Sequence, residues 1–222
     1  FCSYVGVARA FRGLMGWEVG LPKYSVNEGN TVLKINDAVS KIRPYMLAAV
    51  VRNMKFDEEA IVDLMEIQED LHWGIGRNRK KASIGVHNLD VLKQPFTFTA
   101  VEPDKVRFVP LDKTEDMSLR EILEKHEKGT AYRHLVDWAP KYPLLIDNDG
   151  KVLSMPPIIN GELTRVSSKT ANVFLDVTGT DYMAVERSLN VLATALADMG
   201  GNVEKVRIKY PNRTVFSPCL AP

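Results

Sequence analysis

The sequence contains few of the residues and patterns that mark specialised protein classes. Of its 222 residues only two are cysteine, Cys2 and Cys219, and they lie near opposite ends of the chain. They form neither a disulfide framework nor a zinc-binding spacing, and this cysteine usage fits a reducing cytoplasm. No hydrophobic run is long enough to span a membrane, and the sequence contains no signal peptide. A disulfide-rich secreted protein or a membrane-spanning protein is therefore not expected.

Charge and histidine content argue against two further kinds of site. The formal net charge is +1, so any contact with RNA must use a local basic patch. The four histidines are His72, His87, His126 and His134. They have no metal-ligand spacing with one another or with the cysteines, so we expect no metal site. No Ser-His-Asp or Cys-His arrangement for nucleophilic catalysis is evident either.

The chain does have enough apolar residues, 45% of the total, to build the core of a sizeable domain. Apolar residues at helical spacing predict helices over residues 4–17, 58–72 and 182–199. Asp57 and Asp181 are placed to cap the second and the third of these helices. Ser118 and Glu121 have capping-box spacing, which predicts another helix that ends at Gly129.

Short apolar or alternating stretches predict strands between the helices. They cover residues 26–35, 45–51, 82–86, 96–100, 107–110, 173–179 and 203–210. Helices and strands are interspersed without a regular βαβ repeat, which is typical of an α+β or a mixed α/β domain. We therefore expect a mixed sheet with packed helices.

Residues 142–160 form the most distinctive stretch of the chain. Two apolar runs, residues 144–146 and 152–153, flank Asp-Asn-Asp-Gly at 147–150, a sequence that favours the positive φ of a tight hairpin. Two consecutive prolines, Pro156 and Pro157, are expected to stop the second strand and to hold the chain extended. The stretch is either a rigid pocket wall or a proline-stiffened loop without chemistry.

A glycine-containing basic loop follows the second predicted helix, at residues 74–81. Its cations are Arg77, Arg79, Lys80 and Lys81. The loop lacks the third glycine of a dinucleotide fingerprint and the lysine-serine ending of a Walker motif, so nucleotide binding is not expected. Two alternatives remain: a solvated basic loop, or a contact with an RNA backbone.

Asp176 is the strongest polar residue in an apolar setting, because it lies in the middle of the predicted strand 173–179. Positions two apart on a strand share a face, so Asp176 and Thr178 point the same way. Asp176 could be a carboxylate at a sheet edge or the cap of a neighbouring turn. Alternatively it is a buried acceptor that a ligand's donor must satisfy. His87, at the end of another strand, is open to a structural or a catalytic interpretation.

Four segments carry a family resemblance. They are Y-P-L-L-I-D (142–147), V-L-S-M-P-P-I-I-N (152–160), N-V-F-L-D-V-T-G-T-D (172–181) and R-P-Y (43–45). Together they resemble the beta subunit of archaeal and eukaryotic-cytosolic phenylalanyl-tRNA synthetase, over nearly the entire chain. The resemblance implies the α+β fold of the tRNA-editing domain, the B three/four domain.

The resemblance also implies how the chain is divided. Residues 1–22 are expected to be the helical tail of a preceding domain, residues 23–211 the editing domain, and residues 212–222 the lead into the next domain. Because the chain opens on Phe1 without a methionine and its first residues are already helix-like, we expect a piece of a longer polypeptide and not a free-standing deacylase.

The activity implied by the resemblance is hydrolysis of the ester in mischarged Tyr-tRNA(Phe). A pocket built for phenylalanine cannot strongly reject tyrosine, which only adds a hydroxyl, so a second site must remove the error. By the resemblance, Asp176 is the carboxylate that recognises tyrosine, where bacterial members carry the longer Glu. Phenylalanine would leave such an acceptor buried and unpaired, at a cost of roughly 1–3 kcal/mol.

The same matching implies the rest of the site. Leu145 and Ser154 would line the pocket, Thr178 would lie beside Asp176, and Asn160 and His87 fall in matching segments. No catalytic residue is assigned, because ester hydrolysis needs a positioned water and a stabilised oxyanion more than a protein nucleophile. The tRNA's own free ribose hydroxyl is a candidate to orient that water.

The implied partners are tRNA(Phe) and an alpha subunit, in a cytoplasmic heterotetramer of two alpha and two beta subunits. ATP and Mg²⁺ would be used by the alpha subunit, and no cofactor is expected in this chain. A different class of function stays open: a non-catalytic module for tRNA docking or subunit assembly. Convergence of Asp176, Ser154 and Thr178 on one cavity would favour the editing site.

Overall fold

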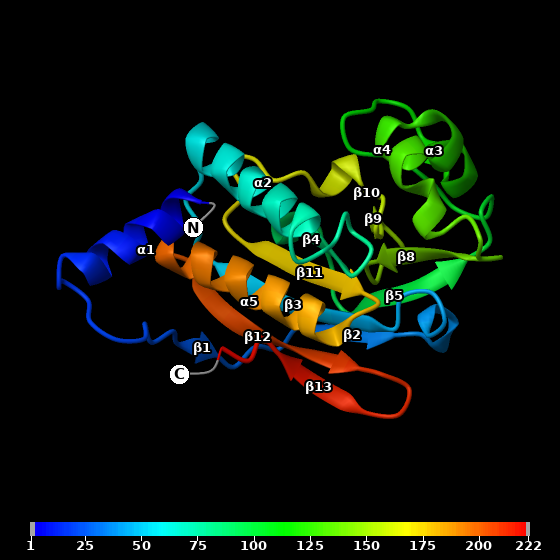
Figure 1. The fold of residues 1–222 in the computed structure, drawn as a ribbon. Coiled ribbons are helices and arrows are strands. Elements are labelled where there is room, and N and C mark those ends of the chain that lie inside the picture. Colours follow the sequence, from blue (N-terminus) through cyan, green and yellow to red (C-terminus); the bar gives the residue numbers. More distant parts are fainter. Residues whose placement is uncertain (1–2, 221–222) are drawn as a thin grey trace.

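The computed structural model describes residues 3–220, which form one large sheet with helices packed on it and a separate two-stranded sheet (Figure 1). The helices are α1 (Tyr4–Leu14), α2 (Glu58–Trp73), α3 (Leu119–Lys125), α4 (Glu127–Tyr132) and α5 (Tyr182–Asp198). The strands are β1 (Val26–Asn27), β2 (Val32–Ile35), β3 (Tyr45–Arg52), β4 (Ala82–Asn88), β5 (Phe96–Val101), β6 (Arg107–Phe108), β7 (Met117–Ser118), β8 (Tyr142–Ile146), β9 (Val152–Met155), β10 (Ile159–Asn160), β11 (Val173–Gly179), β12 (Asn202–Lys209) and β13 (Thr214–Ser217). The expected α+β class with a mixed sheet is confirmed.

The sheet has the strand order β10-β9-β8-β5-β2-β12-β3-β11-β4, with β1 and β13 also paired to β12. β12 connects the part of the sheet made of β10, β9, β8, β5 and β2 to the part made of β3, β11 and β4. It runs parallel to β2 and antiparallel to β3. β11 lies between β3 and β4 and is antiparallel to both. This register places Asp176 opposite Ala48 on one side and Gly85 on the other.

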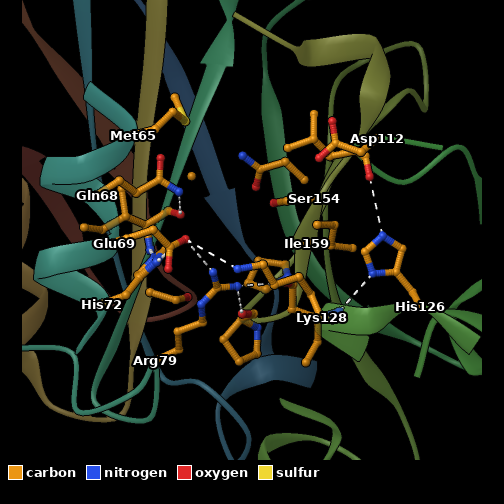
Figure 2. Close-up of a pocket in the computed structure, with 18 of the residues that line it drawn as sticks. Met65, Gln68, Glu69, His72, Arg79, Asp112, His126, Lys128, Ser154 and Ile159 are labelled. Carbon is orange, nitrogen blue, oxygen red and sulfur yellow. Dashed lines mark hydrogen bonds and ion pairs between the residues drawn. The ribbon is translucent and has the colours of Figure 1, made fainter. Parts of the chain in front are cut away.

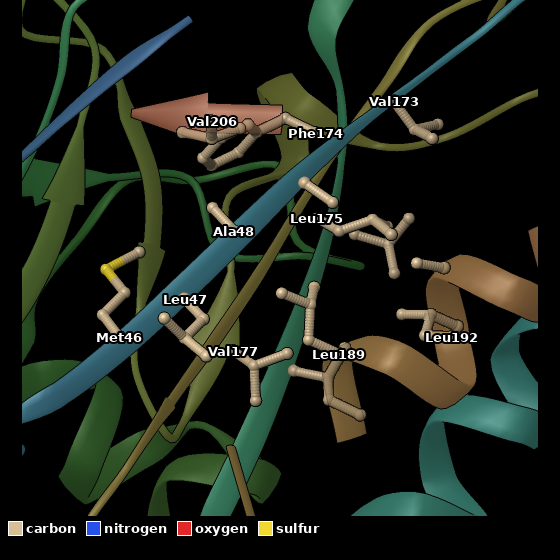
Figure 3. Packing of buried hydrophobic residues seen from close by; sticks show 14 of the residues in the cluster. Met46, Leu47, Ala48, Val173, Phe174, Leu175, Val177, Leu189, Leu192 and Val206 are labelled. Atoms are coloured by element: carbon tan, nitrogen blue, oxygen red, sulfur yellow. The ribbon is translucent and has the colours of Figure 1, made fainter. Parts of the chain in front are cut away.

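Packing of α5 decides which face of β11 is apolar. Leu175 and Val177 belong to the same buried cluster as Leu189 and Leu192 of α5 (Figure 3). Because side chains alternate along a strand, Asp176 points to the opposite face. Every residue of β11 is buried, so the carboxylate is buried as well.

A second, smaller apolar cluster supports the β8–β9 hairpin. It joins Leu119, Ile122 and Leu123 of α3 to Leu144 and Met155 of the hairpin. The sequence predicted one helix from Ser118 to Gly129, but the structure has two, α3 and α4, with the break at His126. Gly129 does not end a helix. It lies inside α4, where a side chain would overlap the Ile122 carbonyl, so glycine is required for the close contact between the two helices.

The hairpin itself is confirmed. The Asp147 side chain accepts hydrogen bonds from the backbone N–H groups of Asp149 and Lys151, both at 2.9 Å, and Gly150 has φ +80°. These bonds satisfy turn donors that β8 and β9 cannot pair.

The two prolines do not hold the chain extended, as the sequence had suggested. The Ile158 N–H donates to the Met155 carbonyl at 2.8 Å, so Pro156 and Pro157 form a turn. β10 then pairs back on β9, with Asn160 opposite Ser154. Prolines fit the turn because no ladder donor is needed there. The residues of this turn line the cavity that is described below.

Both terminal segments contact the large sheet or its helices. α1 is linked to α5 by an ion pair between Arg9 and Asp198. β13 pairs with β12, and the Ser217 hydroxyl donates to the Ala48 carbonyl at 2.6 Å. The expected lead into a next domain therefore includes a strand of this sheet, and the domain boundaries stay predictions.

Within residues 3–220, no helix has the length and apolar composition needed to cross a membrane. Cys219 is an exposed free thiol, and Cys2 lies outside the described residues. The same residues contain no group of three or more His, Cys, Asp or Glu side chains that could hold a metal ion.

Candidate functional site

A cavity of about 370 Å³ opens between α2, β4 and the β9–β10 turn (Figure 2). This size lies in the ordinary range for small-molecule sites, roughly 300–1,000 Å³. α2 contributes Gln68 and Glu69, while β9 contributes Ser154 and β10 contributes Asn160. Asp176 of β11 reaches the cavity from the sheet.

The Asp176 carboxylate is buried, with 2% of the residue exposed. Its Oδ2 lies 2.8 Å from His87 Nε2. Among the described residues no hydrogen bond forms to Oδ1, and Asp176 is one of the residues that line the cavity. Gly85 faces Asp176 across the strand pair, and any side chain at that position would overlap the carboxylate.

His87 supports Asp176 from behind the cavity surface. It is fully buried, and its Nδ1 lies 2.9 Å from the Thr164 hydroxyl. The ring also packs against Phe174, with centroids 6.4 Å apart. Sequence reasoning gave His87 an open role and did not identify Gly85 or Thr164. They lie 91 and 12 residues from Asp176, and no local pattern connects them to it.

Ser154 and Asn160 face each other on β9 and β10, and both line the cavity. The Ser154 hydroxyl is buried and has no hydrogen-bond partner in the described part of the chain. Leu145 is opposite Ser154 on β8 and fully buried, but it is not one of the residues at the cavity surface. Leu145 therefore packs behind the part of the cavity surface that contains Ser154.

Thr178 shares a face with Asp176, as predicted, but it does not line the cavity. Its hydroxyl accepts a hydrogen bond from Arg43 Nε at 3.0 Å and lies 3.1 Å from the Ser83 hydroxyl. Arg43 also donates to the Thr178 carbonyl at 2.7 Å. Thr178 is thus a connection between Arg43 and the strand that carries Asp176.

Arg43 is a buried cation that the sequence showed only as part of the R-P-Y segment. Its hydrogen bonds go to hydroxyl and carbonyl oxygens, including Ser83 Oγ at 3.1 Å and the Arg79 carbonyl at 3.2 Å. Desolvation lowers the pKa of Arg43 to about 9, and the negative charge of Asp176 acts in the opposite direction. Arg43 therefore places a positive charge near the Asp176 carboxylate without pairing with it directly.

The basic loop divides into one interior cation and three surface cations. Arg79 is buried, so the expectation of a solvated or RNA-facing side chain is wrong at this position. Its guanidinium donates to Glu69 at 2.8 Å and to the Ile158 carbonyl at 2.9 Å, and it lies over the Tyr132 ring at 4.5 Å. These contacts tie α2 and α4 to the β9–β10 turn.

The other three cations, Arg77, Lys80 and Lys81, are exposed. Lys81 is paired with Asp181 at 3.0 Å. Arg77, Asn78 and Arg79 all have positive φ, between 50° and 65°. Non-glycine residues rarely adopt this left-handed conformation, so the buried contacts of Arg79 hold the loop in a strained shape.

The α2 wall carries two further polar groups of interest. His72 Nε2 accepts the Ile84 N–H at 2.8 Å, which places the proton on Nδ1, 3.5 Å from Glu69 Oε1. Burial lowers the pKa of His72, and the adjacent His72 ring contributes most to lowering the pKa of Glu69 to about 2. The Gln68 side-chain oxygen is buried and has no hydrogen-bond partner within residues 3–220, while its nitrogen donates to the Ile84 carbonyl at 3.3 Å.

Comparison with known proteins identifies the family. Residues 30–196 match the B3/4 domain family. The chain is 51% identical to the phenylalanine–tRNA ligase beta subunit of Methanothrix thermoacetophila over 220 residues, which are 99% of this chain and 41% of that subunit. It is 48% identical to the beta subunit of Pyrococcus furiosus, over 99% of this chain and 40% of that subunit.

A solved structure agrees with these matches. It is an N-terminal fragment of the phenylalanyl-tRNA synthetase beta subunit from Pyrococcus horikoshii, with a TM-score of 0.95 and 43% identity over 97% of this chain and 62% of that fragment. The chain spans about two fifths of the length of the beta subunits that it matches. The chain belongs to the B3/4 domain family, in the form found in phenylalanine–tRNA ligase beta subunits.

Proposed function

We propose that this chain is an editing domain that hydrolyses the ester of tyrosine mischarged onto tRNA(Phe), and that Asp176 recognises the tyrosine hydroxyl. The observation that supports the proposal most directly is the carboxylate itself. Asp176 is buried at a cavity of small-molecule size, with Oδ2 hydrogen-bonded to His87 and Oδ1 open to a ligand.

This arrangement accounts for selectivity by desolvation. A tyrosine ring that fills the cavity would donate its hydroxyl hydrogen to Oδ1 of Asp176. A phenylalanine ring would expel water from the same oxygen and return no hydrogen bond. An unpaired buried charged group costs roughly 1–3 kcal/mol or more, which corresponds to about a tenfold to a hundredfold preference for tyrosine.

Two buried groups without partners are available to the rest of the substrate. The Ser154 hydroxyl can donate or accept, and the Gln68 side-chain oxygen can accept from the α-ammonium group of the amino acid. Within residues 3–220 the Ser154 hydroxyl has no hydrogen bond to a base, so a covalent serine intermediate is not part of the proposal. Hydrolysis by an oriented water, with the free ribose hydroxyl of the tRNA as a candidate orienting group, is the mechanism that we propose.

The macromolecular partners belong to the same proposal. Arg77 and Lys80 are exposed and remain candidates for contact with the tRNA backbone, and Lys81 is a weaker candidate because it is paired with Asp181. We propose a cytoplasmic enzyme of two alpha and two beta subunits, in which the alpha subunit uses ATP and Mg²⁺. No cofactor is proposed for the chemistry of this chain.

The test compares deacylation of Tyr-tRNA(Phe) and Phe-tRNA(Phe) by the chain and by its Asp176→Ala variant. We expect release of tyrosine to be faster than release of phenylalanine, and the preference to be lost in the variant. Asp147→Asn is the matched control, because Asp147 is an equally buried carboxylate that serves a hairpin turn outside the cavity.

The possible results separate the two classes of function. Unchanged selectivity in Asp176→Ala would refute the recognition role. Binding of tRNA without deacylation, by this chain and by the complete two-subunit enzyme, would instead indicate the non-catalytic docking module.

A further inference from the structure

Thr164, His87 and Asp176 form a chain of hydrogen bonds that ends at the cavity. The distances are 2.9 Å from Thr164 Oγ1 to His87 Nδ1 and 2.8 Å from His87 Nε2 to Asp176 Oδ2. The exposed fractions of the three residues are 1%, 0% and 2%. Because burial excludes water, each hydrogen that forms one of these hydrogen bonds must be carried by Thr164, His87 or Asp176.

The position of the Thr164 hydroxyl hydrogen follows from its neighbours. The hydroxyl lies near His87 Nδ1, which can donate or accept, and near two carbonyl oxygens that can only accept, that of Gly161 at 3.1 Å and that of Leu153 at 3.4 Å. Both carbonyls already accept a backbone N–H, Gly161 from Thr164 and Leu153 from Gly161, so neither is left unpaired if the hydroxyl hydrogen goes elsewhere. His87 Nδ1 has no other partner in the described part of the chain, and it is the nearest of the three atoms.

We infer that Thr164 is a positioning residue, which donates to His87 Nδ1 and so selects the tautomer that carries its hydrogen on Nε2. In that tautomer His87 donates to Asp176 Oδ2. The carboxylate then keeps its charge, and Oδ1 faces the cavity as an ionised acceptor. This inference rests on the proposed function, because it explains how the tyrosine-reading oxygen is prepared.

The opposite tautomer would weaken recognition. If Nδ1 carried the only ring hydrogen, Nε2 could only accept, and a hydrogen bond to Asp176 would require the carboxyl group to be protonated. Oδ1 would then be a neutral carbonyl oxygen. Hydrogen bonds to ionised acceptors are about twice as strong as neutral ones, so selectivity for tyrosine depends on the tautomer.

The experiment measures the tautomer and the activity on the same samples. Protein labelled with ¹⁵N-histidine reports the protonation of each ring nitrogen, and the His87 signals are those lost in His87→Gln. In the unsubstituted chain at neutral pH we expect a protonated Nε2 and an unprotonated Nδ1. Thr164→Val, which keeps the shape but not the hydroxyl, is expected to lose this preference. Its tyrosine-over-phenylalanine deacylation ratio should fall by about tenfold, the change that about 1.4 kcal/mol produces.

Two control variants complete the design. Thr164→Ser keeps the hydroxyl and should restore both the tautomer and the ratio. Thr170→Val removes the hydroxyl of another buried threonine, which accepts from the Ser167 N–H at 3.0 Å away from the cavity, and should change neither.

The outcomes distinguish this inference from the proposed function. A protonated Nδ1 in the unsubstituted chain would overturn the inference, whatever the activity. An unchanged tautomer and ratio in Thr164→Val would overturn it as well. The expected tautomer, together with a shift in Thr164→Val but no preference for tyrosine in any variant, would support the positioning role and reject the proposed editing function.

Discussion

The Asp176 carboxylate can lie where it does because residue 85 has no side chain. Gly85 is opposite Asp176 in the β4–β11 pair. A Cβ built on Gly85 would overlap Asp176 Oδ2 and would lie 2.5 Å from His87 Nε2. Gly85→Ala therefore forces the carboxylate and the imidazole apart without changing either residue.

The expected loss of selectivity follows from the hydrogen bond between Asp176 and His87, which Gly85→Ala breaks. A hydrogen bond to a charged group contributes about 1.5–3 kcal/mol, so the tyrosine-over-phenylalanine ratio should fall by about tenfold to a hundredfold. Alanine also lowers the conformational entropy of the unfolded chain by about 0.4–1 kcal/mol, which offsets part of the loss of stability. We expect the melting temperature to fall by only a few degrees, because 1 kcal/mol corresponds to about 2–4 °C in a chain of this size.

The assay is deacylation of the two aminoacyl-tRNAs, with thermal unfolding measured in parallel. Gly150→Ala is the matched control. Gly150 has φ +80° and an open environment, so alanine costs about 1–2 kcal/mol of stability but does not reach the cavity. A folded Gly85→Ala protein that keeps the full preference for tyrosine would show that the Asp176–His87 pair does not set selectivity.

Two further predictions concern the wall formed by α2 and the basic loop. Arg79→Met should lower the free energy of unfolding by about 1–3 kcal/mol, because the Ile158 carbonyl loses its buried donor and Glu69 loses one of its cationic neighbours. Arg77→Met, at an exposed position, should change it by less than about 0.5 kcal/mol, so equal urea midpoints for the two variants would contradict the role of Arg79. Lowering the pH should also destabilise the chain, because the pKa values of His72 and Glu69 are both below their ordinary values of 6.5 and 4.5, so the unfolded state binds more protons in both ranges. The contribution of Glu69 to the free energy of unfolding is complete above pH 4.5 and is lost toward pH 2. Glu69→Gln should therefore make the urea midpoint decline less steeply between pH 4.5 and pH 2. An unchanged decline would contradict the lowered pKa of Glu69.

The sequence alone determined most of the local structure and the class of protein. Asp57 and Asp181 cap the helices that they were predicted to cap, and the turn after Ile146 is the predicted hairpin. Alternation along residues 173–179 correctly placed Asp176 and Thr178 on one face. These features depend on backbone geometry and on neighbours a few residues away, which a sequence displays directly. The segments around them were also sufficient to indicate the family.

Tertiary structure decided which of those polar residues meet, and where. Thr164, His87 and Gly85 meet Asp176 from separate elements, and nothing in their own segments indicates it. Thr178 was expected at the cavity, but Arg43 binds its hydroxyl behind the wall. The sequence of the basic loop also does not show which cation is buried, because Arg79 lies among other lysine and arginine residues.

The physical reason is that burial of a polar or charged group depends on its partners. Leaving such a group unpaired in the interior costs several times more than one hydrogen bond contributes on average. Arg79 turns inward because Glu69, two backbone carbonyls and the Tyr132 ring are there to receive it. Asp176 remains a buried acceptor because His87 holds one of its oxygens while the cavity leaves the other free.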